Sequence, residues 1–306
     1  MSVAGLIAGA RAGEQRDIAR LISRIEDGAN DAREAMRVLA GFAGRAHVIG
    51  VTGAPGVGKS TTTSALVTAI RARGNRVAVL AVDPSSPFSG GALLGDRIRM
   101  QQHATDEGVF IRSMASRGHL GGLAATTPQV IRVLDAAGFD AVIIETVGVG
   151  QSEVEIAATA DSSIVLIAPG MGDSIQAAKA GILEIGDIFV VNKADRDGAD
   201  TTVRELRNMI ALGQHDGWRP PVLKTVASIG EGVDAVLAAI DEHRTWLVGS
   251  GQDRRRKLRR VHDEICALVI GATRAQLSVR NAEVDALSAA VLDGAIDAYT
   301  AAEQLS

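Results

Sequence analysis

The sequence predicts an α/β fold in which a mainly parallel sheet is flanked by helices. From residue 46 to about 245, short apolar runs rich in β-branched residues alternate with segments that have apolar residues at helical spacing. This alternation is typical of parallel strands joined by crossover helices. Helical patterns precede and follow it, so we expect three parts: an N-terminal helical segment (1–45), the α/β domain (46–250) and a C-terminal helical extension (251–306).

Composition narrows the class of protein. The 306 residues are 46% hydrophobic, 22% charged and 3% aromatic, with a net charge of −4, which is typical of a soluble globular chain without a bias toward nucleic acid or anionic membranes. The lone Cys266 excludes an intramolecular disulfide and fits a reducing compartment. No run approaches the ~18 apolar residues of a membrane span, and the N-terminus has no long apolar stretch. We expect a cytoplasmic protein without nucleic-acid or membrane partners.

The first 45 residues are predicted to be helical. Four apolar residues recur on one helical face, at i, i+3, i+4 and i+7: Ile18, Leu21, Ile22 and Ile25. Gly28 is a suitable end for this helix, and a second helical pattern covers about 31–43.

Seven apolar segments are predicted to form the strands of the sheet. They cover residues 47–52, 76–82, 109–112, 141–145, 162–168, 188–192 and 221–225. Several are followed at once by a polar or glycine-rich loop. Since ligands of parallel α/β folds bind at the carboxyl ends of the strands, these loops are the candidates for a binding site.

The loop after the first strand carries the most specific motif, G-x-x-x-x-G-K-S from Gly53 to Ser60. Its glycines allow the backbone to curl, so that successive N–H groups point at phosphate oxygens beside a helix N-terminus. Lys59 can reach the β- and γ-phosphates, and the Ser60 hydroxyl can bind Mg²⁺. The motif predicts a P-loop NTPase fold in which a nucleotide contacts Gly53, Ala54, Pro55, Gly56, Val57, Gly58, Lys59, Ser60 and Thr61.

The loop after the sixth strand reads "NKAD", from Asn192 to Asp195, and predicts that the base is guanine. The Asp195 carboxylate can accept hydrogen bonds from the guanine ring N–H and 2-amino group, whereas adenine would leave it unpaired. Lys193 can lie over the base, and Asn192 can tie loops together. The expected ligands are therefore GTP and GDP.

A third loop, "VASIGEG" at 226–232, follows the last strand. Backbone N–H groups of Ala227 and Ser228 can bind the guanine carbonyl, and we include the adjacent Ile229 in this contact. The alternative is an ordinary loop that caps the helix from Glu231.

Three acidic residues are candidates for a magnesium site. Asp83 follows the second strand and Glu145 ends the fourth, both at the edge where the phosphates are expected. Asp96 lies on a glycine-rich segment that can close over the γ-phosphate; the alternative is a helix N-cap. Gly148 and Gly150 suggest a loop that rearranges when this phosphate leaves.

These motifs together resemble one family. "GAPGVGKST", "VDPSSPFSGGALLGDRIRM", "ETVGVGQSE" and "NKAD", in this order and spacing, are similar to those of the MeaB/ArgK GTPases, a metallochaperone class of P-loop GTPases associated with methylmalonyl-CoA mutase. The resemblance covers nearly the whole chain. It implies a GTPase chaperone that protects, loads or reactivates an adenosylcobalamin-dependent acyl-CoA mutase, so that adenosylcobalamin enters only through this partner. It also implies a homodimer built on the C-terminal extension.

The resemblance also implies roles for single residues. It carries magnesium-site roles onto Ser60, Asp83, Asp96 and Glu145, and it makes 168–181 a third mobile loop with Lys179 near the nucleotide. The catalytic set expected on this basis is Lys59, Asp83, Asp96, Glu145 and Lys179.

Three alternatives remain. A GTPase that delivers nickel or cobalt needs clustered Cys or His ligands, but Cys266 is alone and the six histidines show no metal-binding spacing. An ATP-dependent kinase linked to arginine transport, the role behind the ArgK name, conflicts with Asp195. Nucleic-acid binding through the basic run 254–260 is disfavoured because no aromatic residues interleave with it.

Overall fold

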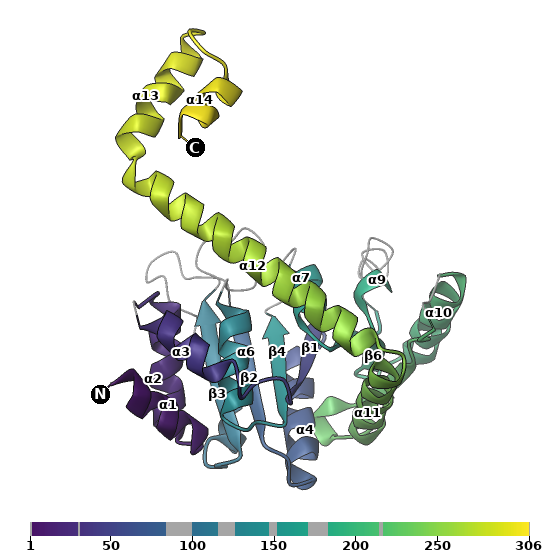
Figure 1. Cartoon of the computed structure of the whole chain (residues 1–306). Helices are drawn as coiled ribbons and strands as arrows, with labels where there is room; N and C mark the ends of the chain where they lie inside the picture. The colour runs from purple at the N-terminus through teal and green to yellow at the C-terminus, as the bar shows by residue number, and fades with distance from the viewer. Residues whose placement is uncertain are drawn as a thin grey trace. The chain divides into compact units, whose positions relative to one another are not determined.

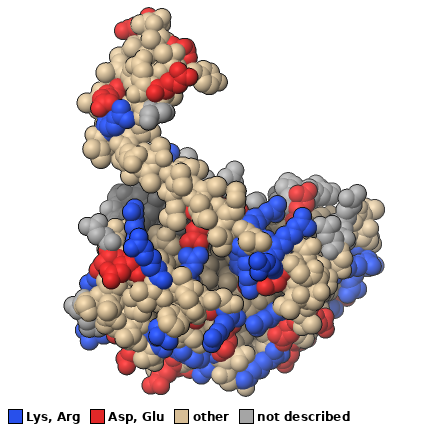
Figure 2. Space-filling model, in the orientation of Figure 1, with Lys and Arg blue, Asp and Glu red and all other residues tan. Residues whose placement is uncertain are grey.

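The computed structural model describes the backbone of residues 2–29, 31–83, 100–115, 126–146, 152–170, 183–213 and 217–305. Its contacts divide the chain into two compact units, Met1–Arg256, called here the core unit, and Lys257–Ser306, called the tail. On the visible face of the core unit, basic and acidic side chains are interspersed (Figure 2). No helix among the described residues is long and apolar enough to cross a membrane.

The core unit is built on a seven-stranded sheet with the order β3-β2-β4-β1-β5-β6-β7, and every neighbouring pair is parallel (Figure 1). The strands are β1 His47–Gly53, β2 Val77–Asp83, β3 Val109–Ala115, β4 Ala141–Thr146, β5 Ser162–Ile167, β6 Ile188–Asn192 and β7 Val222–Thr225. All seven predicted strands are confirmed. The largest difference is β3, which continues to Ala115 because it pairs with the whole length of β2.

Alternate residues of the strands face two separate cores, as the pleat of a sheet requires. On one face, β-strand residues such as Val51 and Ile143 pack against α4 (Lys59–Ala72) and α11 (Val233–Gly249). On the other face lie α6 (Thr127–Ala136) and α7 (Ser152–Thr159). Gly50 permits the close approach of α7, since a Cβ there would lie 2.3 Å from Ile156 Cγ2.

The N-terminal helices complete the second core. They are α1 (Val3–Arg11), α2 (Gln15–Glu26) and α3 (Ala32–Leu39), and they contact α6. The apolar face predicted for the second helix is buried, with Ile18, Leu21, Ile22 and Ile25 no more than 2% exposed. Asp135 of α6 accepts hydrogen bonds from the backbone N–H groups of residues 44–46, which attaches the end of this segment to the sheet layer.

Four further elements complete the described part of the core unit. They are η1 (Gln101–His103), α9 (Leu183–Ile185), α10 (Ala199–Leu212) and η3 (Ala227–Ile229). α10 contacts β6 and β7. Its apolar residues Val203, Leu206 and Ile210 form a third small core with Phe189.

All regular elements of the described tail are helices, as the sequence predicts. α12 (Gln252–Val279) begins in the core unit and continues as the tail, followed by α13 (Asn281–Leu292) and α14 (Ala298–Leu305). The Arg280 guanidinium joins these helices, donating to the carbonyl of Leu305 at 2.7 Å and to Glu283 at 2.7 Å. No residue of α12 or α13 is buried within the chain.

Candidate functional site at the carboxyl edge of the sheet

Four predicted site segments lie at the carboxyl ends of β1, β4, β6 and β7, which is one edge of the sheet. The segment after β1 turns directly into α4. Gly53, Gly56 and Gly58 have positive φ values of 139°, 80° and 98°, a region that side chains rarely adopt. The glycine spacing of the motif therefore corresponds to three backbone positions that need glycine.

Two of these glycines are also required by their neighbours. A Cβ on Gly53 would lie 2.3 Å from the carbonyl oxygen of Leu166, and one on Gly58 would lie 2.4 Å from Asn192 Nδ2. The loop is thus pressed against β5 and against the segment after β6. Between them, the buried Val57 side chain fixes the loop to the core.

The Lys59 side chain lies inside this loop. Its Nζ donates to the carbonyl oxygens of Gly53 at 2.7 Å and Ala54 at 3.1 Å, and the residue is only 7% exposed. The ammonium group is therefore positioned by the loop itself, beside the N-terminus of α4. A glycine-rich loop with a buried ammonium beside a helix N-terminus is suited to bind phosphate oxygens.

Ser60 and Glu145 meet beside this loop. The Ser60 hydroxyl donates a 2.6 Å hydrogen bond to Glu145 Oε1, and both residues are buried. One comes from the first turn of α4 and the other from the end of β4, the neighbour of β1. The sequence placed both residues in a magnesium site, and the structure brings their oxygen atoms together.

Asn192 connects three loops through one buried amide. Its Nδ2 donates to the carbonyl of Val57 at 2.8 Å, and its Oδ1 accepts from the backbone N–H of Ala227 at 3.1 Å and from Thr225 Oγ1 at 3.0 Å. The prediction that Asn192 ties loops together is confirmed. Thr225, which the sequence analysis did not single out, is part of the same junction.

Two further residues of the "NKAD" segment, Lys193 and Asp195, lie toward the surface of this edge. Lys193 Nζ donates to the carbonyl of Gly56 at 2.7 Å, so its aliphatic stem crosses from the segment after β6 to the loop after β1. Among the residues that the structure describes, Lys193 is the one non-glycine with a positive φ, 58°. Asp195 is exposed, with its carboxylate accessible to a ligand.

The segment after β7 forms the 3₁₀-helix η3 over Ala227–Ile229. Ala227 is buried against Asn192, whereas Ser228 and Ile229 are exposed. The predicted contact region is therefore adjacent to the "NKAD" segment. The alternative, a loop capping a helix from Glu231, is partly realised, because α11 begins at Val233 after Gly232.

The remaining predicted site residues are not all described. Asp83 ends β2, so its backbone lies at the same edge, but its side chain is outside the described part of the structure. Asp96, the loop around Gly148 and Gly150, and Lys179 also lie outside it. The described residues contain no group of three or more His, Cys, Asp or Glu side chains arranged to hold a metal ion.

Comparison with protein families gives one match over most of the chain. A family model described as methylmalonyl Co-A mutase-associated GTPase MeaB matches residues 17–282. The match includes the described site segments and continues into the tail.

Relatives and a solved structure agree with this match. A Pyrococcus abyssi protein whose name describes it as a GTPase is 46% identical over 98% of this chain and 94% of its own length. GTPase ArgK of Escherichia coli is 43% identical over 69% of this chain and 65% of its own, and the mitochondrial methylmalonic aciduria type A homolog of Mus musculus is 38% identical over 67% and 50%. The crystal structure of a LAO/AO transport system kinase matches with a TM-score of 0.75 and 27% identity, covering 99% of this chain and 96% of that one.

Proposed function

The chain belongs to the MeaB family of GTPases, and we propose that it couples GTP hydrolysis to an adenosylcobalamin-dependent acyl-CoA mutase, which it protects, loads or reactivates. The observation that carries this proposal is the extent of the family match, which runs from residue 17 to residue 282 and so includes part of the tail as well as the nucleotide motifs. The names of the family and of the mouse relative connect those proteins with methylmalonyl metabolism. We therefore propose that the partner of this chain is a mutase of the methylmalonyl-CoA type.

Within this proposal, the carboxyl edge of the sheet binds and hydrolyses GTP. The backbone of 53–61 and Lys59 hold the β- and γ-phosphates, and Asp195 recognises the guanine edge, with Ala227, Ser228 and Ile229 beside the base. Phosphoryl transfer depends mainly on positioning and on neutralising the charge of the γ-phosphate. Lys59, already buried and pre-positioned, supplies one part of that neutralisation.

The residues at Ser60 and Glu145 fit a magnesium ion. Mg²⁺ prefers oxygen ligands and takes few of them from protein. The structure supplies a hydroxyl and a carboxylate oxygen 2.6 Å apart in a buried position at the head of α4. Asp83 and Asp96 are proposed to complete the site, with Lys179 near the nucleotide. When bound, the ion supplies positive charge to the β- and γ-phosphates.

The tail is proposed to form a homodimer. Large apolar residues of α12 are exposed at i, i+3, i+7 and i+10, the spacing of one helical face: Leu258, Val261, Ile265 and Leu268, between 45% and 59% exposed. Residues 265–273 of α12, which carry the second half of this stripe, include no charged side chain. An apolar stripe of this length on a helix with no buried residue favours pairing with a second copy.

Two alternatives, a GTPase that delivers nickel or cobalt and an ATP-dependent kinase linked to arginine transport, have less support. Among the described histidines and cysteine, His262 Nε2 and Cys266 Sγ lie 4.0 Å apart, but this exposed pair supplies two ligands where a closed zinc-type site takes four. A kinase acting with arginine transport would require ATP, and the exposed Asp195 at the base-binding edge favours guanine. Neither reading explains the family match as well.

Hydrolysis measured with and without a candidate mutase tests the proposal. The protein alone is expected to hydrolyse GTP slowly, and the adenosylcobalamin-dependent mutase is expected to bind it and raise the rate by roughly 10-fold or more, as groups supplied in trans do in other GTPases. Lys59→Ala is the control for hydrolysis by contaminants. If no acyl-CoA mutase binds in either the GDP or the GTP state, or if hydrolysis is already fast and unaffected, the mutase proposal is wrong, while the GTPase assignment stands.

A further inference from the structure

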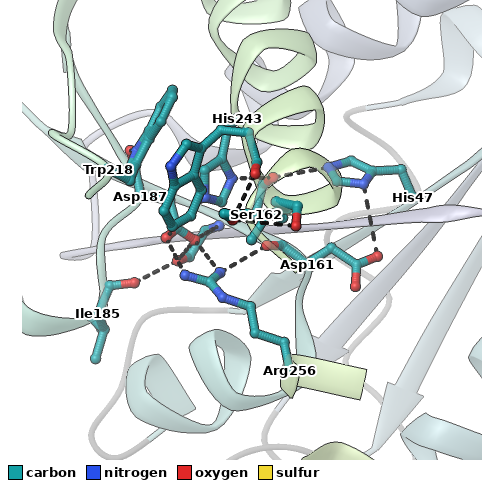
Figure 3. Close-up of polar contacts among 12 residues, drawn as sticks. His47, Asp161, Ser162, Ile185, Asp187, Trp218, His243 and Arg256 are labelled. Atoms are coloured by element: carbon teal, nitrogen blue, oxygen red, sulfur yellow. Dashed lines mark hydrogen bonds and ion pairs between the residues drawn. The ribbon is translucent and has the colours of Figure 1, made fainter. Parts of the chain in front are cut away.

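A buried polar cluster lies at the amino edge of the sheet, opposite the nucleotide edge, and the proposed function does not use it (Figure 3). Its members come from the starts of three strands and from two helices, and all belong to the core unit: His47, Asp161, Ser162, Asp187, His243 and Arg256. Five of the six are less than 9% exposed. Such a concentration of charge inside a fold is costly and calls for a physical reason.

Arg256 makes the strongest contacts of the cluster. Its guanidinium grips the Asp187 carboxylate with both terminal nitrogens, at 2.8 and 3.0 Å, and also donates to the carbonyl of Asp161 at 2.8 Å. Arg256 lies in the first turns of α12, the helix that continues as the tail. One side chain therefore attaches the beginning of that helix to the starts of β5 and β6.

Further hydrogen bonds fix the position of Asp187. It also accepts from the backbone N–H and the hydroxyl of Ser163, both at 2.8 Å, and Trp218 Nε1 donates to its carbonyl at 2.8 Å. Burial by itself would raise the pKa of Asp187, but the hydrogen bonds from Arg256 and the charges beside it hold this pKa below its usual value. The carboxylate is therefore ionised throughout the neutral range.

The remaining members reach Asp187 through His243, whose Nε2 lies 3.4 Å from Asp187 Oδ1. Ser162 Oγ lies between His47 Nε2 at 2.9 Å and His243 Nδ1 at 2.7 Å, and His47 Nδ1 lies 3.8 Å from Asp161 Oδ2. This order resembles a Ser-His-Asp triad, but Ser162 and His243 are fully buried, so no substrate can reach the hydroxyl. The arrangement is a structural support and not a catalytic site.

We propose that the Arg256–Asp187 pair is a latch that fixes the first turn of α12, the part of this helix that belongs to the core unit, against the starts of β5 and β6. Asp187 is buried, whereas about a third of the Arg256 side chain is exposed. Such a pair seldom adds net stability over an apolar pair, but it can select one geometry, because any other position of Arg256 leaves the buried carboxylate without its partner. The exposed neighbours Arg254 and Arg255 have no such role. This inference is independent of the nucleotide and of the partner mutase.

Hydrogen exchange of the intact protein tests the latch. Arg256→Met keeps an unbranched side chain but removes the charge and the hydrogen bonds. Arg256→Lys retains a positive charge without the two-pronged contact. Arg255→Met, at the preceding exposed residue, is the matched control. We expect Arg256→Met to accelerate exchange of the α12 amides 256–262 by about tenfold or more, with β1 and β5 amides and GDP affinity unchanged. Arg256→Lys should fall between Arg256→Met and the native protein, and Arg255→Met should match the native protein.

Two results would overturn the proposal. Unchanged exchange at amides 256–262 in Arg256→Met would mean that the pair does not hold the helix. Equal acceleration in α12, β1 and β5 would mean that the pair supports the whole core unit and has no specific action on the start of α12. If Arg256→Met is too poorly folded to measure, Asp187→Asn and Arg256→Lys are used instead. Exchange at amides 256–262 is then compared with exchange in β1 and β5 for each variant and the native protein.

Discussion

Asn192 Nδ2 donates a 2.8 Å hydrogen bond to the carbonyl of Val57, joining two motifs that lie 135 residues apart in the chain. The same amide accepts from the backbone N–H of Ala227 on its other side. The phosphate-binding loop, the "NKAD" segment and η3 are therefore held together before any ligand contact is considered. Loss of this one amide should affect all three.

Asn192→Ala is expected to weaken GDP binding and to destabilise the core unit. The substitution leaves the Val57 carbonyl and the Ala227 N–H without their partner in a buried position, at about 1–3 kcal/mol for each group. Urea unfolding and GDP titration would measure the two effects. Thr225→Val is the matched control, since it removes one hydrogen bond to Asn192 and leaves both loop contacts in place; an equally large loss of affinity in the control would contradict the bridging role.

The sheet was predictable from sequence because its strands are buried on both faces. Segments such as 188–192 are continuous apolar runs, and such runs have few alternatives in an α/β chain. The phosphate-binding loop was predictable for a different reason. Three of its glycines have positive φ values that other residues rarely adopt, so the spacing of the glycines predicts the backbone conformation of the loop.

The amino-edge cluster could not be predicted in the same way. His47, Ser162 and His243 are far apart in sequence and form no spacing pattern, and they meet only because β1 and β5 are neighbours and α11 packs on them. From the sequence, the basic run 254–260 is considered only for nucleic-acid binding, yet Arg256 within it is paired with a buried carboxylate. A charged residue looks alike in sequence whether it faces water or a buried partner.

Ser60→Ala should reduce the magnesium dependence of nucleotide binding. The Ser60 hydroxyl lies 2.6 Å from Glu145 Oε1 in the proposed ion site, and its loss removes one candidate ligand. We expect the Mg²⁺ concentration for half-maximal GTP hydrolysis to rise by roughly 10-fold. GDP binding in the presence of a chelator should be nearly unchanged. Thr68→Ala, at an exposed position of the same helix, is the control. An unchanged magnesium requirement in Ser60→Ala would remove Ser60 from the site.

Stability should fall as the pH is lowered below about 6.5. Burial lowers the pKa of His243 from 6.5 to about 4, a shift that the Asp187 charge only partly opposes. Between these two values the unfolded chain binds a proton that the folded protein does not, so stability rises with pH in this window and is constant above it. The stability lost at pH 5.5 is on the order of 1 kcal/mol.

Urea unfolding at several pH values measures the free energy of unfolding. Tryptophan emission is a suitable signal, because both tryptophans, Trp218 and Trp246, pack against the His243 ring. His243→Gln should be less stable at pH 7.5 but should show a smaller decrease between pH 7.5 and 5.5. His262→Gln, at an exposed position, is the control. A pH dependence that is identical in native protein and His243→Gln would show that other groups cause it.

Charge placed on the exposed stripe of α12 should abolish dimer formation. Ile265→Asp and Leu268→Asp each put a carboxylate on the apolar face, whereas Arg274→Ala alters an exposed polar position of the same helix. Sedimentation should give a dimer for the native protein and for the control, and a monomer for the double variant with GDP binding retained. A native protein that sediments as a monomer at micromolar concentration would contradict the proposed assembly.

Binding of GTP and XTP to Asp195→Asn tests guanine recognition most directly. The substitution exchanges an acceptor for an amide that also donates, so the guanine N–H and 2-amino groups lose acceptors and GTP affinity should fall by roughly 2–4 kcal/mol. Xanthine carries a carbonyl in place of the 2-amino group and can accept from the new amide, so the variant should prefer XTP. Lys59→Ala should instead weaken GTP and XTP alike. If Asp195→Asn binds GTP as the native protein does and gains no affinity for XTP, the "NKAD" segment does not read the base and the proposed nucleotide site is wrong.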